Sequence, residues 1–411
     1  MWNRWKFTCV FVAAAQLASA AVAQQVPTES GTISGARATG VSVYKGIPFA
    51  APPVGDLRWR PPVHAASWTG TRKADAFAPA CPKCVTIAGQ SSGSISVSIL
   101  MASPLAKGLF QRAIGESGGL FEPLQLAPKF LLANAERDGD EYAAALGAPS
   151  LKELRGLPAS LFTGNAGGIV HAVIEPYVLP LSPYEAFASG QQNDVPLQIG
   201  SNAEEARAMV DVSHETAATF DSDLEHSVGP LPPALVAAYP HTTDEEARPA
   251  QLDLERDLRF GWGMWAWARL QAGTGKSPVF YDSFRQQPPF PVGSVYAGWG
   301  ASHFAELWYV FEQLDQSPWN WTAADRNLAE EVSSSSVNFA RSGDPNGPGL
   351  PLWAVFTNAQ NKVQYLAAPI TVGGVANIRG LSVFDAVYTT VRGTPFALGR
   401  RRLARRYHER F

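Results

Sequence analysis

The sequence has few cysteines and few charged residues. Only 3 of its 411 residues are cysteine, and Asp, Glu, Lys and Arg together make up 17% of the chain, below the share that is typical of globular proteins. The formal net charge of −3 argues against nucleic acid or an anionic surface as the main partner. Hydrophobic residues make up 46% of the chain, which indicates a globular protein with a substantial core.

Long apolar runs are missing beyond the N-terminus, so we expect no membrane span. Residues 1–23 combine the positive charges of Arg4 and Lys6, an apolar stretch over Phe7–Leu17 and small residues at Ala21–Ala23. That order is typical of a secretory signal peptide. We therefore expect an exported protein, either periplasmic or secreted.

The two cysteines of the mature chain form the pattern C-x-x-C. Cys9 lies in the predicted signal peptide, which leaves Cys81 and Cys84. In an exported protein such a pair can close a disulfide, act as a redox pair or supply half of a zinc site. No second Cys/His pair stands at zinc-ligand spacing, and no thioredoxin-like strand precedes the motif. We expect a structural or leftover pair, bonded or not, and no metal or organic cofactor.

A G-x-S-x-G pattern at Gly89–Gly93 follows the apolar stretch Val85–Ile87. This order is typical of the nucleophile elbow of α/β-hydrolases, in which a strand turns sharply into a helix and exposes a strained serine, here Ser91. Residues 94–99 alternate with period two, which alone would indicate a strand. We expect a helix instead, because the elbow requires one and Pro104 ends it.

A second G-x-S-x-G pattern, at Gly115–Gly119, competes with the first. Only one of the two serines can be the nucleophile, and either motif could be an ordinary Gly/Ser turn. Ser117 is followed by two glycines and no clear helical run, so we expect it at the end of the next parallel strand. The context of strand, turn and helix favours Ser91 as the nucleophile.

The N-terminal part of the mature chain carries a family signature. Val41–Ala50 and the preceding Gly31–Gly35 read as an antiparallel ribbon, and the prolines of Ala51–Pro62 exclude a helix. This region resembles the N-terminal signature of the type B carboxylesterases, which include the cholinesterases. Ser103–Phe110 and Phe339–Asn346 resemble later blocks of that family.

The resemblance covers most of the mature chain and implies the α/β-hydrolase fold over residues 24–398. A mostly parallel central sheet, lacking several N-terminal strands of the family, would carry helical cap insertions such as residues 213–258. Ser277–Phe284 reads as a late strand. The spacing of Trp262 and Trp265 favours helical core packing over a ligand site.

The resemblance also places the remaining catalytic residues. In the family the acid follows a strand that matches Val195–Asn202, and Glu205 occupies its position, with Ala206 in place of the usual glycine. Glu204 is the alternative, and both glutamates could simply be residues of a first helical turn that its dipole favours. The residues around His303 resemble the family block G-A-x-H-x-x-E.

That block implies His303 as the general base and Glu306 as a supporting polar residue. The chain order Ser91, Glu205, His303 is the order of this fold. The implied chemistry is hydrolysis of a small carboxylic ester through an acyl-serine intermediate. Gln90 replaces the glutamate that choline-specific relatives place before the nucleophile, so choline esters are not expected.

One block of the family is missing between Cys84 and Val85. The block would hold several strands and a His-Gly-Gly-Gly loop, on the order of a hundred residues, and no H-G-G-G occurs anywhere in the chain. Because that loop supplies most oxyanion-hole donors, the backbone N–H of Ser92 is the only one identifiable. We expect Val85–Ala88 to lose a neighbouring strand and form an exposed sheet edge.

Two functions therefore fit the sequence. The first is a secreted serine carboxylesterase, and the second is an impaired or inactive deletion remnant or an esterase-like binding module. Residues 399–411 add an arginine-rich tail, which is usually solvated, with contact to nucleic acid or anionic lipid as a minor alternative. Neither the ester nor the oligomeric state can be read from the sequence.

Overall fold

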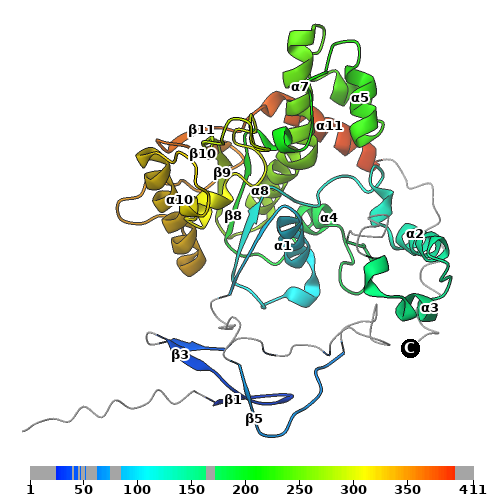
Figure 1. Ribbon diagram of the computed structural model, residues 1–411, viewed down its shortest axis with the longest axis vertical. Coiled ribbons are helices and arrows are strands. Elements are labelled where there is room, and N and C mark those ends of the chain that lie inside the picture. Colours follow the sequence, from blue (N-terminus) through cyan, green and yellow to red (C-terminus); the bar gives the residue numbers. More distant parts are fainter. Residues whose placement is uncertain are drawn as a thin grey trace, which may run out of the picture. The chain divides into compact units, whose positions relative to one another are not determined.

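The structure is a computed structural model and describes residues 25–38, 41–44, 47, 51, 63–74, 85–162 and 172–393 (Figure 1). The predicted signal peptide, the two cysteines of the mature chain, residues 52–62 and the arginine-rich tail lie outside the described residues. The chain divides into two compact units, which are Met1–Cys81 with Ala148–Ala159, and Pro82–Gly147 with Ser160–Phe411. The predicted domain over residues 24–398 and the gap inside it stay predictions.

The larger unit is built on a sheet whose described strands follow the order β11-β10-β9-β8-β7-β6. Neighbours from β6 to β10 pair in parallel, and β11 pairs antiparallel with β10. The strands are β6 (Thr86–Gln90), β7 (Arg112–Glu116), β8 (Leu197–Asn202), β9 (Val279–Phe284), β10 (Lys362–Leu366) and β11 (Thr371–Gly374). The mostly parallel sheet and the late strand that the sequence predicts are thus confirmed.

Strand β6, which leads to Ser91, lies at the edge of the described sheet. It pairs only with β7 among the described strands, in a register that places Gly89 opposite Gly115. Its residues are half-buried or exposed, whereas nearly all residues of β8 and β9 are buried. The exposed edge expected beside Val85–Ala88 is therefore present in the described part of the chain.

Alternating residues of the central strands build a core on each face of the sheet. Leu197 and Val279 belong to the larger core, which also includes residues of helices α1 and α8. Ile114 and Phe280 point to the other face and pack with Phe339 of helix α10. Figure 1 accordingly shows α1 and α8 on one side of the strands and α10 on the other. These helices are α1 (Ser92–Ala102), α8 (Trp262–Thr274) and α10 (Ala323–Ser342).

Helix α1 explains the period-two pattern that follows Ser91. Ser94 and Ser98 are four residues apart and both are fully buried. The Ser94 hydroxyl donates a hydrogen bond of 2.5 Å to the carbonyl of Gly118, and that of Ser98 donates to the carbonyl of Ile95. Ser94 and Ser98 therefore lie on the tightly packed side of a helix, whereas Ser96 is exposed, and the expected helix is confirmed.

Helices connect and cover the later strands. Residues 213–258, expected to be a helical cap, form α5 and α7, with α6 between them, and α7 runs into α8 through the π-helical turn Asp257–Gly261. Trp262 and Trp265 of α8 are buried in the larger core, as expected. The remaining bounds in this unit are α2 (Leu132–Ala145), α4 (Pro183–Ala188), α5 (Phe220–Val228), α6 (Pro233–Val236), α7 (Asp244–Arg256), α9 (Leu307–Val310) and α11 (Ile378–Gly393).

The smaller unit contains short strands in the region expected to form a ribbon. β1 (Gln25–Thr28) pairs antiparallel with β2 (Gly31–Ser34), which pairs in parallel with β5 (Thr71–Lys73). β3 (Ala36–Ala38) and β4 (Val41–Val43) form a separate antiparallel pair. The unit also holds helix α3 (Leu151–Gly156), which begins with a capping box between Ser150 and Glu153.

Candidate active site

Ser91 lies at a sharp turn between β6 and α1. Its φ of 56° and ψ of −120° are strained for a residue with a side chain, as a nucleophile elbow requires. Its backbone N–H donates to the carbonyl of Glu116, and its own carbonyl accepts from Ile95. A Cβ on Gly89 would lie 2.2 Å from the backbone of Gly93, so only glycine permits this turn.

Gly118 is an elbow residue that the sequence analysis did not single out. A Cβ on it would lie 2.4 Å from the carbonyl oxygen of Ser91. The loop after β7 can approach the elbow this closely only because residue 118 has no side chain. The second G-x-S-x-G pattern was the signal in the sequence that could have pointed to Gly118. The loop that carries this pattern packs against the elbow.

Ser117, the competing serine, ends strand β7 as expected. It has a φ of 54° and is fully buried, and its backbone N–H donates to the carbonyl of Gly200 on β8. No helix starts directly after it, and its hydroxyl has no hydrogen-bond partner in the described part of the chain. Ser117 therefore lacks both the exposure and the strand-turn-helix context of Ser91.

Glu205 and His303 meet beside the carboxyl ends of β8 and β9. Glu205 Oε2 lies 2.6 Å from His303 Nδ1, and both side chains are almost fully buried. The other carboxylate oxygen of Glu205 accepts a hydrogen bond from the backbone N–H of Asn202 at 2.8 Å. The carboxylate thus holds one nitrogen of the imidazole in place, so that a neutral ring carries its proton on Nδ1 and has Nε2 free to accept one.

Glu204, the alternative acid, has a different set of partners. Its carboxylate accepts hydrogen bonds from the backbone N–H of Ala301 and the side chain of Gln287, and it pairs with Arg207. A Cβ on Gly300 would lie 2.0 Å from a carboxylate oxygen of Glu204, so this glycine lets the loop approach. Glu204 therefore fastens the backbone of the loop before His303 and does not bond the imidazole.

Three further residues surround the imidazole of His303. Phe260 stacks on the ring with centroids 4.6 Å apart, and Phe304 meets it edge-on at 4.3 Å. The side-chain nitrogen of Gln90 lies 3.4 Å from His303 Nε2. Among the hydrogen bonds of the described residues, none joins His303 Nε2 to the Ser91 hydroxyl. Phe260 and Phe304 had no signal in the sequence that separated them from core aromatics.

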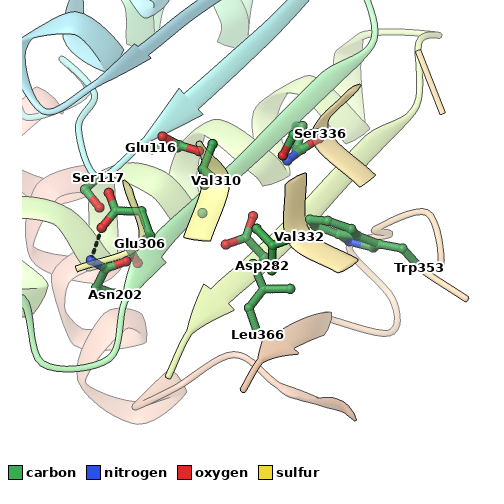
Figure 2. A pocket seen from close by; sticks show the side chains of 13 residues that line it. Glu116, Ser117, Asn202, Asp282, Glu306, Val310, Val332, Ser336, Trp353 and Leu366 are labelled. Atoms are coloured by element: carbon green, nitrogen blue, oxygen red, sulfur yellow. Dashed lines mark hydrogen bonds between the residues drawn. The ribbon is translucent and has the colours of Figure 1, made fainter. Parts of the chain in front are cut away.

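Glu306 lies behind the pair of Glu205 and His303. Figure 2 shows its carboxylate beside Ser117 and bonded to the side-chain amide of Asn202, which also donates to the carbonyl of Ser302. Burial, with the negative charge of Glu205, raises the pKa of Glu306 from an ordinary 4.5 to about 7. The structure thus places this residue next to the predicted acid, as a neighbour without direct contact to the imidazole.

Two more carboxyl groups line the cavity with Glu306. Glu116 ends β7 and Asp282 lies on β9, and both face the cavity in Figure 2. Burial raises the pKa of each well above its ordinary value; the charge of Glu306 adds to the effect on both, and that of Asp282 adds to the effect on Glu116. The residues lining the cavity include no Lys, Arg or His, so protonation is how these groups avoid a buried net charge.

The predicted oxyanion donor is placed beside the elbow. Ser92 is the first residue of α1, so its backbone N–H has no acceptor within the helix and lies at the positive end of the helix dipole. Across the described residues, no group of three or more His, Cys, Asp or Glu side chains could hold a metal ion. None of the helices in those ranges is both long and apolar enough to cross a membrane.

Comparisons with known proteins point to one family. A sequence model described as the carboxylesterase family matches residues 22–84 and 82–372. The chain is 30% identical to mouse carboxylesterase 1C over 69% of its own length and 55% of that protein. It is 27% identical to the para-nitrobenzyl esterase of Bacillus subtilis over 71% of its own length and 60% of that protein. The chain thus spans little more than half the length of these two relatives.

One relative and one solved structure extend further. Fumonisin B1 esterase of Sphingopyxis macrogoltabida is 24% identical, over 80% of this chain and 84% of that protein. The solved structure of a PNB esterase superposes with a TM-score of 0.69 at 21% identity, covering 88% of this chain and 99% of that one. This likeness shows that the sheet and its helices form an α/β-hydrolase fold.

Proposed function

The chain belongs to the carboxylesterase family, and from this premise we propose that it hydrolyses carboxylic esters with Ser91, Glu205 and His303 as its catalytic triad. The observation that carries the proposal is the 2.6 Å contact between His303 Nδ1 and Glu205, beside the carboxyl ends of the strands and next to the strained elbow of Ser91. Relatives named carboxylesterase and para-nitrobenzyl esterase support the reaction class.

Each residue has one task in the proposed reaction. His303 Nε2 takes the proton of the Ser91 hydroxyl, and the resulting alkoxide attacks the ester carbonyl. Glu205 holds the imidazole in the required tautomer and stabilises the imidazolium. His303 then protonates the leaving alcohol, and water repeats the steps on the acyl-serine. Ser92 N–H donates to the oxyanion that forms at the carbonyl.

The Ser91 hydroxyl must first approach Nε2, which lies 3.4 Å from the side-chain nitrogen of Gln90. Hydrogen bonds between nucleophile and base are often long in structures without substrate and shorten when substrate binds. We expect the Gln90 side chain to move aside when an ester enters. With the imidazole proton on Nδ1, Nε2 can accept a hydrogen bond from the side-chain amide of Gln90.

An impaired enzyme is the second function, and the exposed edge at β6 favours it. The two segments that match the family model meet at residues 82–84, beside the predicted gap between Cys84 and Val85. The alignment with fumonisin B1 esterase runs over 475 positions while covering 80% of a 411-residue chain, so it opens gaps in this chain. Both facts support a missing internal block and with it a weakened oxyanion hole.

We extend the proposal to location and partners. Residues 1–23 have the pattern of a signal peptide, which supports export to the periplasm or the medium. The expected partner is a small carboxylic ester, and nothing in the charge of the chain favours nucleic acid. Secretion is tested by the N-terminal sequence of protein recovered outside the cytoplasm.

Labelling with a fluorophosphonate tests the triad most directly. The purified chain should react at Ser91, and mapping of the modified peptide should find the label on residues of the elbow. Ser91→Ala should abolish both labelling and hydrolysis of a short p-nitrophenyl ester, while Ser117→Ala should leave the labelling in place. A label on Ser117, or hydrolysis that survives in Ser91→Ala, would refute the assignment.

A further inference from the structure

A π-helical turn joins two helices next to His303. Helix α7 does not pass into α8 through an ordinary turn; Asp257–Gly261 is wound more widely, and the N–H of Trp262 donates to the carbonyl of Asp257, five residues earlier. Such turns cost hydrogen-bond geometry and occur frequently at functional sites. We therefore expect neighbouring contacts that stabilise the wide turn.

The turn is fastened by one buried carboxylate. Asp257 is 1% exposed and accepts hydrogen bonds from the Tyr239 hydroxyl at 2.8 Å, from Asn377 at 2.6 Å and from Arg256 at 2.9 Å. A Cβ on Gly261 would lie 2.6 Å from a carboxylate oxygen of Asp257, so glycine leaves room for the carboxylate beside the turn. Side chains from the end of α7 and from two turns elsewhere in the chain thus hold the carboxylate at the start of the π-helical turn.

The π-helical turn positions the side chain of Phe260. Phe260 lies within the turn and is 8% exposed, and its ring lies over the imidazole of His303 at 4.6 Å with only 22° between the ring planes. Glu205 holds the imidazole at its edge through Nδ1, and Phe260 covers one of its faces. Two contacts at right angles restrict both rotation and tilt of the ring.

We propose that Phe260, carried by the turn Asp257–Gly261, is a positioning residue that orients His303 and stabilises its imidazolium form. An aromatic ring attracts a cation that lies over its face, and Phe260 presents its face to the imidazole. The attraction arises only when His303 carries the proton taken from Ser91. It therefore favours the charged transition state over the neutral resting state.

The inference rests on the proposed function, because it assigns the imidazolium to a step of that reaction. The titratable groups around the imidazole in the described structure are the carboxyl of Glu205, which bonds Nδ1, and that of Glu306 behind it. Both are present in every variant used to test Phe260. A change that follows substitution of Phe260 is therefore a change at the face of the ring.

The test compares Phe260→Leu with Phe260→Tyr in the full chain. Leucine fills much of the space but has no aromatic face, so we expect kcat to fall about three- to thirtyfold with little change in KM. The acidic limb of the kcat/KM profile should move to lower pH, since the imidazolium is less favoured. Tyrosine keeps the aromatic face, so Phe260→Tyr should retain most of kcat and most of the position of the acidic limb. Gly261→Ala, which displaces Asp257, should lower kcat and move the acidic limb to lower pH, as Phe260→Leu does.

Phe280→Leu is the matched control for lost packing. Phe280 is also buried but packs against Phe339 and Trp353, away from His303, so this variant should lower stability and leave the pH profile in place. If Phe260→Leu changes only stability, as Phe280→Leu does, the positioning role is wrong.

NMR separates this inference from the triad itself. The ring current of Phe260 should shift the carbon-bound imidazole protons of His303 upfield, and Phe260→Leu should remove that shift and move the midpoint of their titration to lower pH. This result would support the inference even in a chain that hydrolyses no ester, in which case the proposed function alone fails. Unchanged chemical shifts and an unchanged midpoint would overturn the inference whatever the activity.

Discussion

Glu204 and Glu205 are neighbours in the chain but have separate tasks in the structure. One carboxylate fastens the backbone at Ala301, and the other bonds His303. Local sequence could not separate the two, because two acidic residues at the start of a helical turn look alike to propensity and dipole arguments. The family pattern indicated Glu205, and only the path of a loop nearly a hundred residues later shows which carboxylate reaches the imidazole.

We predict that Glu205→Gln lowers kcat by about three to four orders of magnitude while leaving the fold intact. The amide is nearly isosteric, but it cannot stabilise an imidazolium or secure the tautomer with a proton on Nδ1. Glu204→Gln is the matched control, since an amide oxygen can still accept from Ala301. Steady-state kinetics on a p-nitrophenyl ester measure both, and a larger loss in Glu204→Gln would show that the acid is assigned one residue off.

The buried carboxyl of Glu306 makes a second residue-scale prediction. Its folded-state pKa of about 7 lies above the ordinary 4.5, so the fold favours the neutral form. The stability from this group is full below about pH 4.5 and is lost as pH rises towards 7. Glu116 and Asp282, whose pKa values are also raised by burial, contribute with the same sign.

Glu306→Gln should therefore be more stable than the parent chain at pH 8 and close to it at pH 5. Glutamine is neutral at both pH values, and its side-chain oxygen can still accept from Asn202. Urea unfolding of both proteins at the two pH values measures the difference. A parent chain that gains stability relative to Glu306→Gln between pH 5 and 8 would contradict the raised pKa.

At the scale of elements, the sequence predicted the order of strands and helices better than their contacts. The helix after Ser91 was expected in spite of its alternating serines, because the elbow requires it and Pro104 ends it. The antiparallel strands of the smaller unit were expected from short alternating runs. The π-helical turn Asp257–Gly261 was not expected, since it depends on Tyr239 and Asn377, which lie elsewhere in the chain.

The close approach of two loops gives the element-scale prediction. In Gly118→Ala the new methyl group would meet the carbonyl of Ser91 at 2.4 Å, so the elbow must move. We expect a loss of about 1–3 kcal/mol in the free energy of unfolding and a larger proportional loss in kcat, because the displaced residue is the proposed nucleophile. Chemical denaturation and ester kinetics measure the two effects.

Gly263→Ala in helix α8 serves as the control for Gly118→Ala. A Cβ there lies at an ordinary 3.6 Å from the carbonyl of Gly119, so the methyl group fits without displacing backbone. Alanine also favours the helix interior. This variant should keep both activity and stability, and equal effects of the two substitutions would show that the elbow tolerates a side chain at residue 118.

At the scale of the molecule, the notable feature is where the elbow lies in the sheet. β6 is the last described strand on its side, and its residues are half-buried or exposed. An unpaired edge in a parallel sheet leaves backbone groups without partners and apolar side chains without cover. The sequence predicted this edge because it lacks, between Cys84 and Val85, a block that we expect from the resemblance to the family, but it could not show which segment lies beside β6.

The last prediction concerns a chain with a family block restored between Cys84 and Val85. One oxyanion donor contributes a factor of about a hundred to a thousand in kcat, and the glycine loop of the block would add about two donors to the N–H of Ser92. The restored chain should therefore hydrolyse esters about four to six orders of magnitude faster. It should also give a higher soluble yield, since the added strands would pair with β6.

The comparison needs a version that restores the strands but not the donors. A second restored chain, in which the glycine loop is replaced by a serine-rich loop of equal length, should recover solubility and little of the rate, because bulkier residues keep the backbone N–H groups away from the oxyanion. The gain in rate would then be assigned to the glycine loop, and the gain in solubility to the strands of the block. Equal rates and equal yields in the original and fully restored chains would show that the original chain already supplies its own oxyanion donors and its own cover for β6.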